Sequence, residues 1–247
     1  MDLTGAFTFL FEDLHWPRKL GIGTALRLVP ILNFSVTGYE VRTARRVAAG
    51  EMTPLPEWDD LGGLWLEGLW LSMARLTYGV VALLLVGLPF SGAGLSVFWA
   101  LSDRSSNLPV GSILLLSSAA LLLALLLGAG LSLLWPGIVA LYVHDPRYRT
   151  CFRLGTVMGL LARYPSAYLT LWGVPLLLAI VIAAWLVPLL GLLNMIPCLG
   201  GLVSVALGVA LTVALLLLSA HLEGQFVLEA GLQTPTPLPS TPVAELP

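Results

Sequence analysis

The sequence predicts an all-α protein, a bundle of helices that crosses a membrane several times. Of its 247 residues, 57% are hydrophobic and only 11% are charged, whereas soluble domains carry roughly 25% charged residues. The apolar residues also occur in long uninterrupted runs, and about 18 or more such residues in succession are typical of a membrane-spanning helix. Composition and run length together exclude an ordinary water-soluble fold.

Four apolar runs predict four transmembrane helices in a multi-pass membrane protein. Three of them contain no charged side chain, and the fourth carries one arginine near its start. Each run ends at Gly, Pro or polar residues, which favour breaks between helices. The four runs are residues 110–143, 166–193, 199–220 and 73–90.

Residues 20–37 predict either a re-entrant or interfacial helical hairpin or a fifth span. The segment is long enough to cross, but it contains Arg27, Pro30 and Asn33. Basic residues collect on the cytoplasmic side of a membrane, and a hairpin would place all twelve Lys and Arg residues except Arg104 on that side. We therefore favour the hairpin, which makes both termini cytoplasmic. Five spans with an outside N-terminus stay the alternative.

Residues 39–48 predict a short interfacial helix. On a helical projection its three arginines share one face and its apolar side chains take the other, which suits a helix lying among anionic lipid headgroups. Two alternatives stay open: the arginines pair with the acids at 51–60, or they serve only to fix orientation. The arginines are Arg42, Arg45 and Arg46, and the opposite face holds Val41, Ala44, Val47 and Ala48.

The segment after Gly50 predicts a turn followed by an amphipathic helix. "TPLPEWDD" reads as an extended turn, with Asp59 or Asp60 as the N-cap of a helix over 61–72. Trp65 and Trp70 in that helix are typical of the aromatic belt at a membrane surface.

A second basic segment, 147–163, predicts another interfacial helix. Asp145 is placed to cap it and Pro146 to begin it. One side carries Arg149, Arg153 and Arg163, and the other carries Leu154, Val157, Met158 and Leu161. The likeness of "RTARR" at 42–46 to "RTCFR" at 149–153 hints at two related halves.

The end of the chain differs from the rest. Residues 231–247 are rich in Pro and Thr with no apolar period, which predicts a disordered tail after a single transmembrane domain over 1–230. Cys151 and Cys198 fall on opposite sides of the predicted membrane, so we expect no disulfide. Neither has the spacing of a metal ligand.

One stretch carries a family resemblance. "ILNFSVTGYEVRTARRVAAGEMTPLPEWDD" at 31–60 resembles the GYxxRxxRR, Gly-Glu and LPEWDD signature of the prokaryotic membrane family catalogued as domain of unknown function 4013. "RYPSAYL", "IPCLGG" and "AHLEGQF" also fit, so the resemblance covers residues 8–229. It implies an integral protein of the cell membrane and no particular chemistry. The positions that it singles out are Gly38, Tyr39, Arg42, Pro56, Glu57, Trp58 and Asp59, with Gly224 and Gln225 less specifically.

No constellation of residues predicts a reaction. His221 and Glu223 are two apart and do not share a helical face, and the glycine-rich 92–97 lacks the lysine of a phosphate-binding loop. We therefore expect no enzyme activity, no cofactor and no metal. The expected partners are the lipid bilayer, anionic headgroups or another membrane protein, and not a nucleic acid.

Two functions remain. The first is a non-catalytic module that associates with lipid or a partner protein through a basic, Trp-rich cytoplasmic face. The second is a component of a small-solute transporter or channel. The interface residues expected for the first function are the family-motif residues Gly38, Tyr39, Arg42, Pro56, Glu57, Trp58 and Asp59, together with Arg45, Arg46, Arg149 and Arg153.

Overall fold

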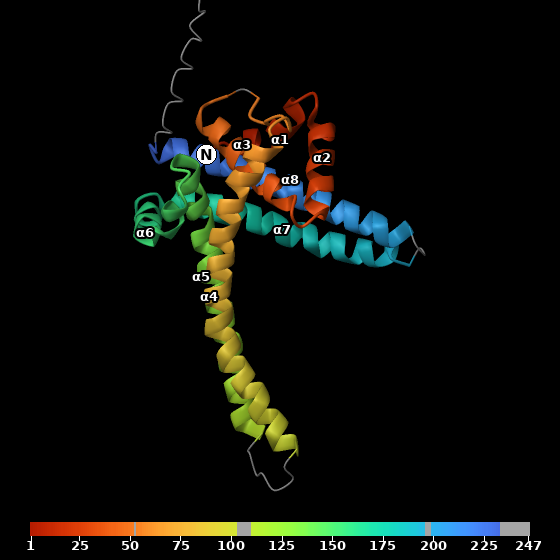
Figure 1. Cartoon of the computed structure of the whole chain (residues 1–247), viewed down its shortest axis with the longest axis vertical. Coiled ribbons are helices and arrows are strands. Elements are labelled where there is room, and N and C mark those ends of the chain that lie inside the picture. The colour runs from red at the N-terminus through yellow and green to blue at the C-terminus, as the bar shows by residue number, and fades with distance from the viewer. Residues whose placement is uncertain (52, 103–109, 196–198, 233–247) are drawn as a thin grey trace, which may run out of the picture. The chain divides into compact units, whose positions relative to one another are not determined.

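The chain is helical throughout the part that the computed structural model describes, residues 1–51, 53–102, 110–195 and 199–232. Every regular element within these ranges is a helix (Figure 1), so the predicted fold class is confirmed. The elements are α1 (Leu3–Glu12), α2 (Trp16–Leu28), α3 (Asn33–Ala48), α4 (Leu61–Ser102), α5 (Val110–His144), the 3₁₀ helix η1 (Tyr148–Phe152), α6 (Leu154–Arg163), α7 (Pro165–Leu193) and α8 (Leu199–Glu229).

Four of these helices are long and apolar enough to cross a membrane, as the sequence predicts. Their outward side chains are largely apolar, and Trp185 and Leu177 are 80% and 62% exposed. Such exposure is costly in water and favourable in lipid, so the chain is a multi-pass membrane protein. The candidate spans are Leu61–Leu85, Ser118–His144, Pro165–Leu193 and Leu199–Glu229.

The boundary predicted between an interfacial helix at 61–72 and a span at 73–90 is wrong. Helix α4 runs without interruption from Leu61 to Ser102, through the glycines and serine of residues 91–94. Glycine and serine do not break a helix in lipid, because no water is present to accept the backbone groups that a break would release. The break predicted at 102–109 falls mostly on residues 103–109, which lie outside the described residues.

Residues 20–37 form two helices joined by a turn, so the alternative of a continuous fifth span is wrong. Helix α2 ends at Leu28 and α3 begins at Asn33. Val29, which precedes Pro30, has φ −99° and ψ 114°, the extended conformation that a following proline imposes. The 13 residues of α2 extend only about 20 Å, less than the roughly 30 Å hydrocarbon layer. A helical hairpin, the favoured prediction, is what forms.

The described chain divides into two compact units. The first contains residues 1–71 and 136 onward, and the second contains Ser72–Trp135. In the second unit the α4 and α5 segments run alongside each other in opposite directions (Figure 1), and the Arg75 guanidinium lies 4.3 Å from the centre of the Trp135 ring. The single domain expected over 1–230 stays a prediction, and the expected disordered tail lies outside the described residues beyond Leu232.

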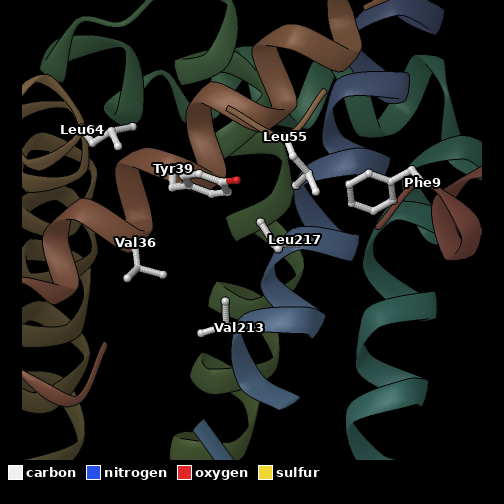
Figure 2. Close-up of a cluster of buried hydrophobic side chains, with 7 residues drawn as sticks. All are labelled: Phe9, Val36, Tyr39, Leu55, Leu64, Val213 and Leu217. Carbon is white, nitrogen blue, oxygen red and sulfur yellow. The ribbon is translucent and has the colours of Figure 1, made fainter. Parts of the chain in front are cut away.

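Helix α3 is a core helix, not the surface helix expected at 39–48. It crosses α8 (Figure 1) and buries Val36, Tyr39, Val41 and Ala44 almost completely. Around it lies an apolar cluster contributed by α1, α3, the 53–60 loop, α4 and α8. Figure 2 shows its members, Phe9, Val36, Tyr39, Leu55, Leu64, Val213 and Leu217.

Glycines allow α3 to approach its neighbours closely. A Cβ atom on Gly38 would overlap the Leu64 carbonyl of α4, and one on Gly68 would overlap the Phe34 carbonyl of α3. A Cβ atom on Gly224 of α8 would overlap the Ala44 carbonyl in the same way. Small residues at crossings bring helix backbones into contact, and here they place α3 between α4 and α8.

The segment after α5 does not begin a helix at Pro146. A 3₁₀ turn forms first, and α6 begins only at Leu154. The Asp145 carboxylate accepts a 3.0 Å hydrogen bond from the Thr150 hydroxyl and so does not cap α6. Of the expected apolar side, Val157 is buried and Leu161 is half-buried, whereas Leu154 and Met158 are exposed.

The two cysteines are not both described. Cys151 is fully buried, and that burial raises the pKa of its thiol to about 11. Cys198 lies outside the described residues, so the expected absence of a disulfide stays a prediction.

Candidate functional site

The 53–60 loop is fixed against α2 and α3 by one aromatic pair. The Trp58 ring stacks on the Tyr39 ring with centroids 4.1 Å apart and an interplanar angle of 11°. The Tyr39 hydroxyl donates a 2.8 Å hydrogen bond to the Pro56 carbonyl, and the Trp58 indole N–H donates one of 3.1 Å to the Lys19 carbonyl. Buried aromatic rings with satisfied polar tips hold a loop in one geometry.

Lys19 is a buried cation with three acceptors. Its ammonium group donates to Asp13 Oδ2 at 2.8 Å and to the Leu55 carbonyl at 3.1 Å, and it pairs with Glu57 Oε1 at 2.7 Å. Only 6% of its side chain is exposed. Three charge-assisted bonds use all the donors of the ammonium group, so Lys19 joins α2 to the loop.

These contacts shift the pKa values of Lys19, Asp13 and Tyr39. Burial lowers the pKa of Lys19, but its bonds to Asp13 and Glu57 outweigh burial and raise the pKa overall. Burial likewise raises the pKa of Asp13, yet the bonds from Lys19 and from the His15 N–H bring it below its usual value. Burial, with the nearby carboxylates, raises the pKa of Tyr39. At neutral pH the lysine and aspartate are therefore charged and the tyrosine is neutral.

The arginines of α3 pair with acids of the same unit, not with the outside. Their side chains are only 22% to 37% exposed, and each contacts at least one carboxylate. The predicted face toward lipid headgroups is wrong for this segment, and the alternative pairing with the acids at 51–60 is confirmed and extends to Glu67. The pairs are Arg42–Asp60 (3.1 Å), Arg42–Glu67 (3.2 Å), Arg45–Glu67 (3.6 Å) and Arg46–Glu51 (3.5 Å).

The two aspartates at the end of the loop have different roles. Asp60 is the N-cap of α4, because its Oδ1 accepts a 2.9 Å hydrogen bond from the Gly63 N–H. That bond, followed by the one from Arg42, holds the pKa of Asp60 below its usual value. Asp59 Oδ1 accepts only the neighbouring Asp60 N–H at 3.0 Å, and its side chain is exposed. Of the two predicted caps, Asp60 is confirmed.

A cavity of about 360 Å³ opens beside this loop. It lies between the beginning of α2 and the loop, and most of its lining is charged. Among the described residues no group of three or more His, Cys, Asp and Glu is placed to hold a metal ion. The lining residues are His15, Arg18, Lys19, Ile22, Glu57, Trp58 and Asp59.

The arginines of the second basic segment contrast with those of α3. Arg149, Arg153 and Arg163, which we call the exposed arginine face, are all exposed. Within the described residues they form no salt bridge, and Arg163 lies 5.8 Å from the Tyr164 ring centre. No described carboxylate therefore neutralises their charges.

The structure brings some of the predicted site residues together and separates others. Tyr39, Pro56, Glu57 and Trp58 meet at the loop, and Arg42 reaches the same loop through Asp60. Gly38 and Gly224 are packing residues at helix crossings. Gln225 hydrogen bonds the backbone of Asp2 through both its oxygen (2.8 Å) and its nitrogen (3.0 Å). Arg149 and Arg153 belong to η1 and the residue after it.

Sequence reasoning missed three side chains that complete the site, Asp13, Lys19 and Glu67. The available signal was the position of isolated charges inside apolar stretches, since a buried charge requires a partner.

The comparisons with known proteins identify a family and no closer relative. The family model described as "Protein of unknown function (DUF4013)" matches residues 22–192, more than half of the chain. The match includes the 31–60 stretch, whereas the "AHLEGQF" segment in α8 lies beyond it. No curated protein matches the chain, and no solved structure does.

Proposed function

The chain belongs to the family described as "Protein of unknown function (DUF4013)", and from this premise we propose that it is a non-catalytic module of the cell membrane. In this proposal it binds anionic lipid headgroups through the exposed arginine face. The proposal includes a cytoplasmic position for that face and for both termini, as the distribution of basic residues favours.

One observation carries the proposal: three exposed arginines lie on η1, α6 and their junction without an acidic partner in the described chain. An arginine guanidinium is suited to bidentate contact with a phosphate. Near an anionic leaflet each such residue contributes about 1 kcal/mol. The surface therefore offers roughly 3 kcal/mol of attraction to anionic lipid.

The apolar neighbours of these arginines support a position at the membrane surface. Phe152, Leu154 and Met158 are 39%, 37% and 53% exposed, and Trp70 lies 5.9 Å from Tyr148, ring centre to ring centre. Exposed apolar side chains interleaved with arginines are typical of helices that lie between headgroups and acyl chains.

The test is lipid retention by the purified full chain. Protein in dodecyl maltoside is mixed with equal amounts of phosphatidylglycerol and phosphatidylcholine and purified again, and the bound lipid is measured by mass spectrometry. We expect wild type to retain phosphatidylglycerol preferentially and the triple variant R149Q/R153Q/R163Q to lose most of that preference, about a hundredfold for the roughly 3 kcal/mol at stake.

The matched control is R46Q, which removes an arginine already paired with Glu51. It should retain phosphatidylglycerol as wild type does. Equal retention by the triple variant and wild type would contradict the proposal and would leave the face for a protein partner.

A small-solute transporter or channel component is the second candidate. It is favoured by Glu67, an ionisable side chain within the candidate span Leu61–Leu85, because charged groups in spans commonly mark solute paths. Cysteine scanning along α4 and α5 tests it. Labelling by a water-soluble maleimide deep within both helices supports this function, and labelling confined to their ends contradicts it.

A further inference from the structure

We propose that the cavity between the beginning of α2 and the 53–60 loop binds a zwitterion that carries an ammonium and a phosphate group. This is the chemistry of a phosphoethanolamine headgroup. The site is distinct from the exposed arginine face, and the proposal does not depend on the function given above.

The size of the cavity suits such a ligand. Its volume of about 360 Å³ lies near the lower end of the roughly 300–1,000 Å³ range of small-molecule sites. It accommodates a headgroup but not the acyl chains of a lipid.

Two charges of opposite sign line the cavity without pairing. Arg18 and Asp59 both border it and are both exposed. Neither takes part in a salt bridge with any described residue, and they do not pair with each other. The Asp59 carboxylate would repel a purely anionic ligand, and the Arg18 guanidinium would repel a purely cationic one. A zwitterion satisfies both.

The other charged lining residues assign the two ends of the ligand. Lys19 uses its three donors on Asp13, Leu55 and Glu57, so the guanidinium of Arg18 is the cation left to bind a phosphate. Glu57 uses Oε1 on Lys19, and its side chain is 63% exposed. Its second oxygen and the Asp59 carboxylate together form the acceptor for an ammonium group.

The cavity wall is held in place before any ligand arrives. Trp58 is fixed on one side by its stack with Tyr39 and at its indole N–H by the Lys19 carbonyl. A Cβ atom on Gly23 would lie 3.3 Å from the Trp58 ring, so α2 also packs closely against the ring. A preformed wall reduces the ordering cost of binding.

The surroundings of the cavity favour a lipid as the source of the headgroup. Phe11 and Leu14 lie four residues and one residue before the lining residue His15, and they are 64% and 88% exposed. Exposed apolar side chains just before the lining segment in the sequence are suited to contact acyl chains while the headgroup is bound. A soluble headgroup fragment shares the same chemistry, so the experiment tests both sources.

The experiment has two arms with the full chain in dodecyl maltoside. In the first, protein is mixed with phosphatidylethanolamine and phosphatidylglycerol, purified again, and its bound lipids are quantified by mass spectrometry. In the second, glycerophosphoethanolamine binding is measured by equilibrium dialysis. The variants are R18Q and D59N, and the control is R147Q, which removes an exposed arginine that pairs with Asp145 and belongs neither to the cavity lining nor to the exposed arginine face. Asparagine at position 59 keeps the oxygen that accepts from the Asp60 N–H, and thermal unfolding verifies that each variant folds.

We expect R18Q and D59N each to reduce phosphatidylethanolamine retention about fivefold, the size of one exposed ionic contact, and R147Q to leave it unchanged. Binding in the lipid arm alone supports a membrane lipid as the source, and binding in both arms supports a site that also takes the free headgroup. Equal retention by R18Q, D59N and wild type would overturn the proposal. A loss of phosphatidylglycerol in R18Q with no change in D59N would also overturn it, because the cavity would then take a simple anion.

Discussion

The two arginine-rich segments resemble each other in sequence and differ in structure. "RTARR" at 42–46 belongs to the buried helix α3, and its arginines pair with carboxylates at distances of 3.1 to 3.6 Å. "RTCFR" at 149–153 forms a 3₁₀ turn and its end, and its arginines are exposed without a salt bridge in the described chain. The acids nearby decide the difference: Glu51, Asp60 and Glu67 surround the first segment. An arginine motif therefore indicates a lipid surface only where the fold leaves its charge unneutralised.

The largest loss of stability is expected when a side chain is added at the crossing of α3 and α4, which positions the first arginine segment. Gly38→Ala places a Cβ atom against the Leu64 carbonyl of α4, and a backbone atom cannot move aside as a side chain can. We expect a loss of about 3 kcal/mol of unfolding free energy, measured by thermal unfolding in detergent.

The matched control for that variant is Gly159→Ala in α6, where no atom lies within 4 Å of the added Cβ. It should be neutral or slightly stabilising, by up to about 1 kcal/mol. Equal losses from the two variants would mean that the first segment is no more tightly packed than the second.

Removing Glu67, the acid that two arginines share, should lower the free energy of unfolding by less than Gly38→Ala does. Glu67→Gln leaves Arg45 without a carboxylate and Arg42 with only Asp60. Complete burial would make the loss about 3–5 kcal/mol. These side chains are 22% to 31% exposed, so we expect about 2 kcal/mol by the same unfolding measurement. A loss below about 0.5 kcal/mol, the size of an ordinary surface substitution, would make the α3 arginines equivalent to the exposed ones.

Alkaline pH should remove the stabilisation that the Lys19 ion pairs provide. The folded-state pKa of Lys19 is raised above its usual 10.5, so its stabilisation is complete below 10.5 and is lost as the pH rises through the higher value. The raised pKa of Tyr39 acts in the same direction. The unfolding temperature should fall between pH 10 and 12, and it should fall less steeply in Lys19→Met. Parallel pH profiles for the variant and wild type would contradict a stabilising role of the Lys19 pairs.

The smallest change in stability is expected when the exposed arginine face is altered. The triple variant R149Q/R153Q/R163Q removes charges that have no salt-bridge partner among the described residues, so its unfolding free energy should stay within about 0.5 kcal/mol of wild type. Differential scanning calorimetry in detergent measures this. A loss as large as that of Glu67→Gln would show that these arginines stabilise the fold and would remove the contrast between the two segments.

The apolar runs predicted the long helices because membrane insertion depends on local hydropathy. A run of uncharged residues is sufficient to identify α5, α7 and α8, and Pro30 is sufficient to divide α2 from α3. The end of α4 was not predictable in the same way, because glycine and serine break helices in water and not in lipid.

The candidate site was predictable in its residues but not in its contacts. The loop motif indicated Tyr39, Pro56, Glu57 and Trp58, which do meet. It could not indicate that Lys19, far away along the chain, supplies the opposing charge. An amphipathic projection of 39–48 shows which face is polar, and it does not distinguish solvent or lipid from acids on another helix.

The glycine crossings of α3 have a mechanical consequence. At Gly38 the backbone of α3 lies against the Leu64 carbonyl of α4, and at Gly224 the backbone of α8 lies against the Ala44 carbonyl and the Val47 side chain of α3. A rotation or slide of α3 would drive carbonyl oxygens into the neighbouring helices. These segments of the three helices therefore form a rigid joint, and a displacement of α4 at Leu64 would be transmitted to α8 without being absorbed on the way.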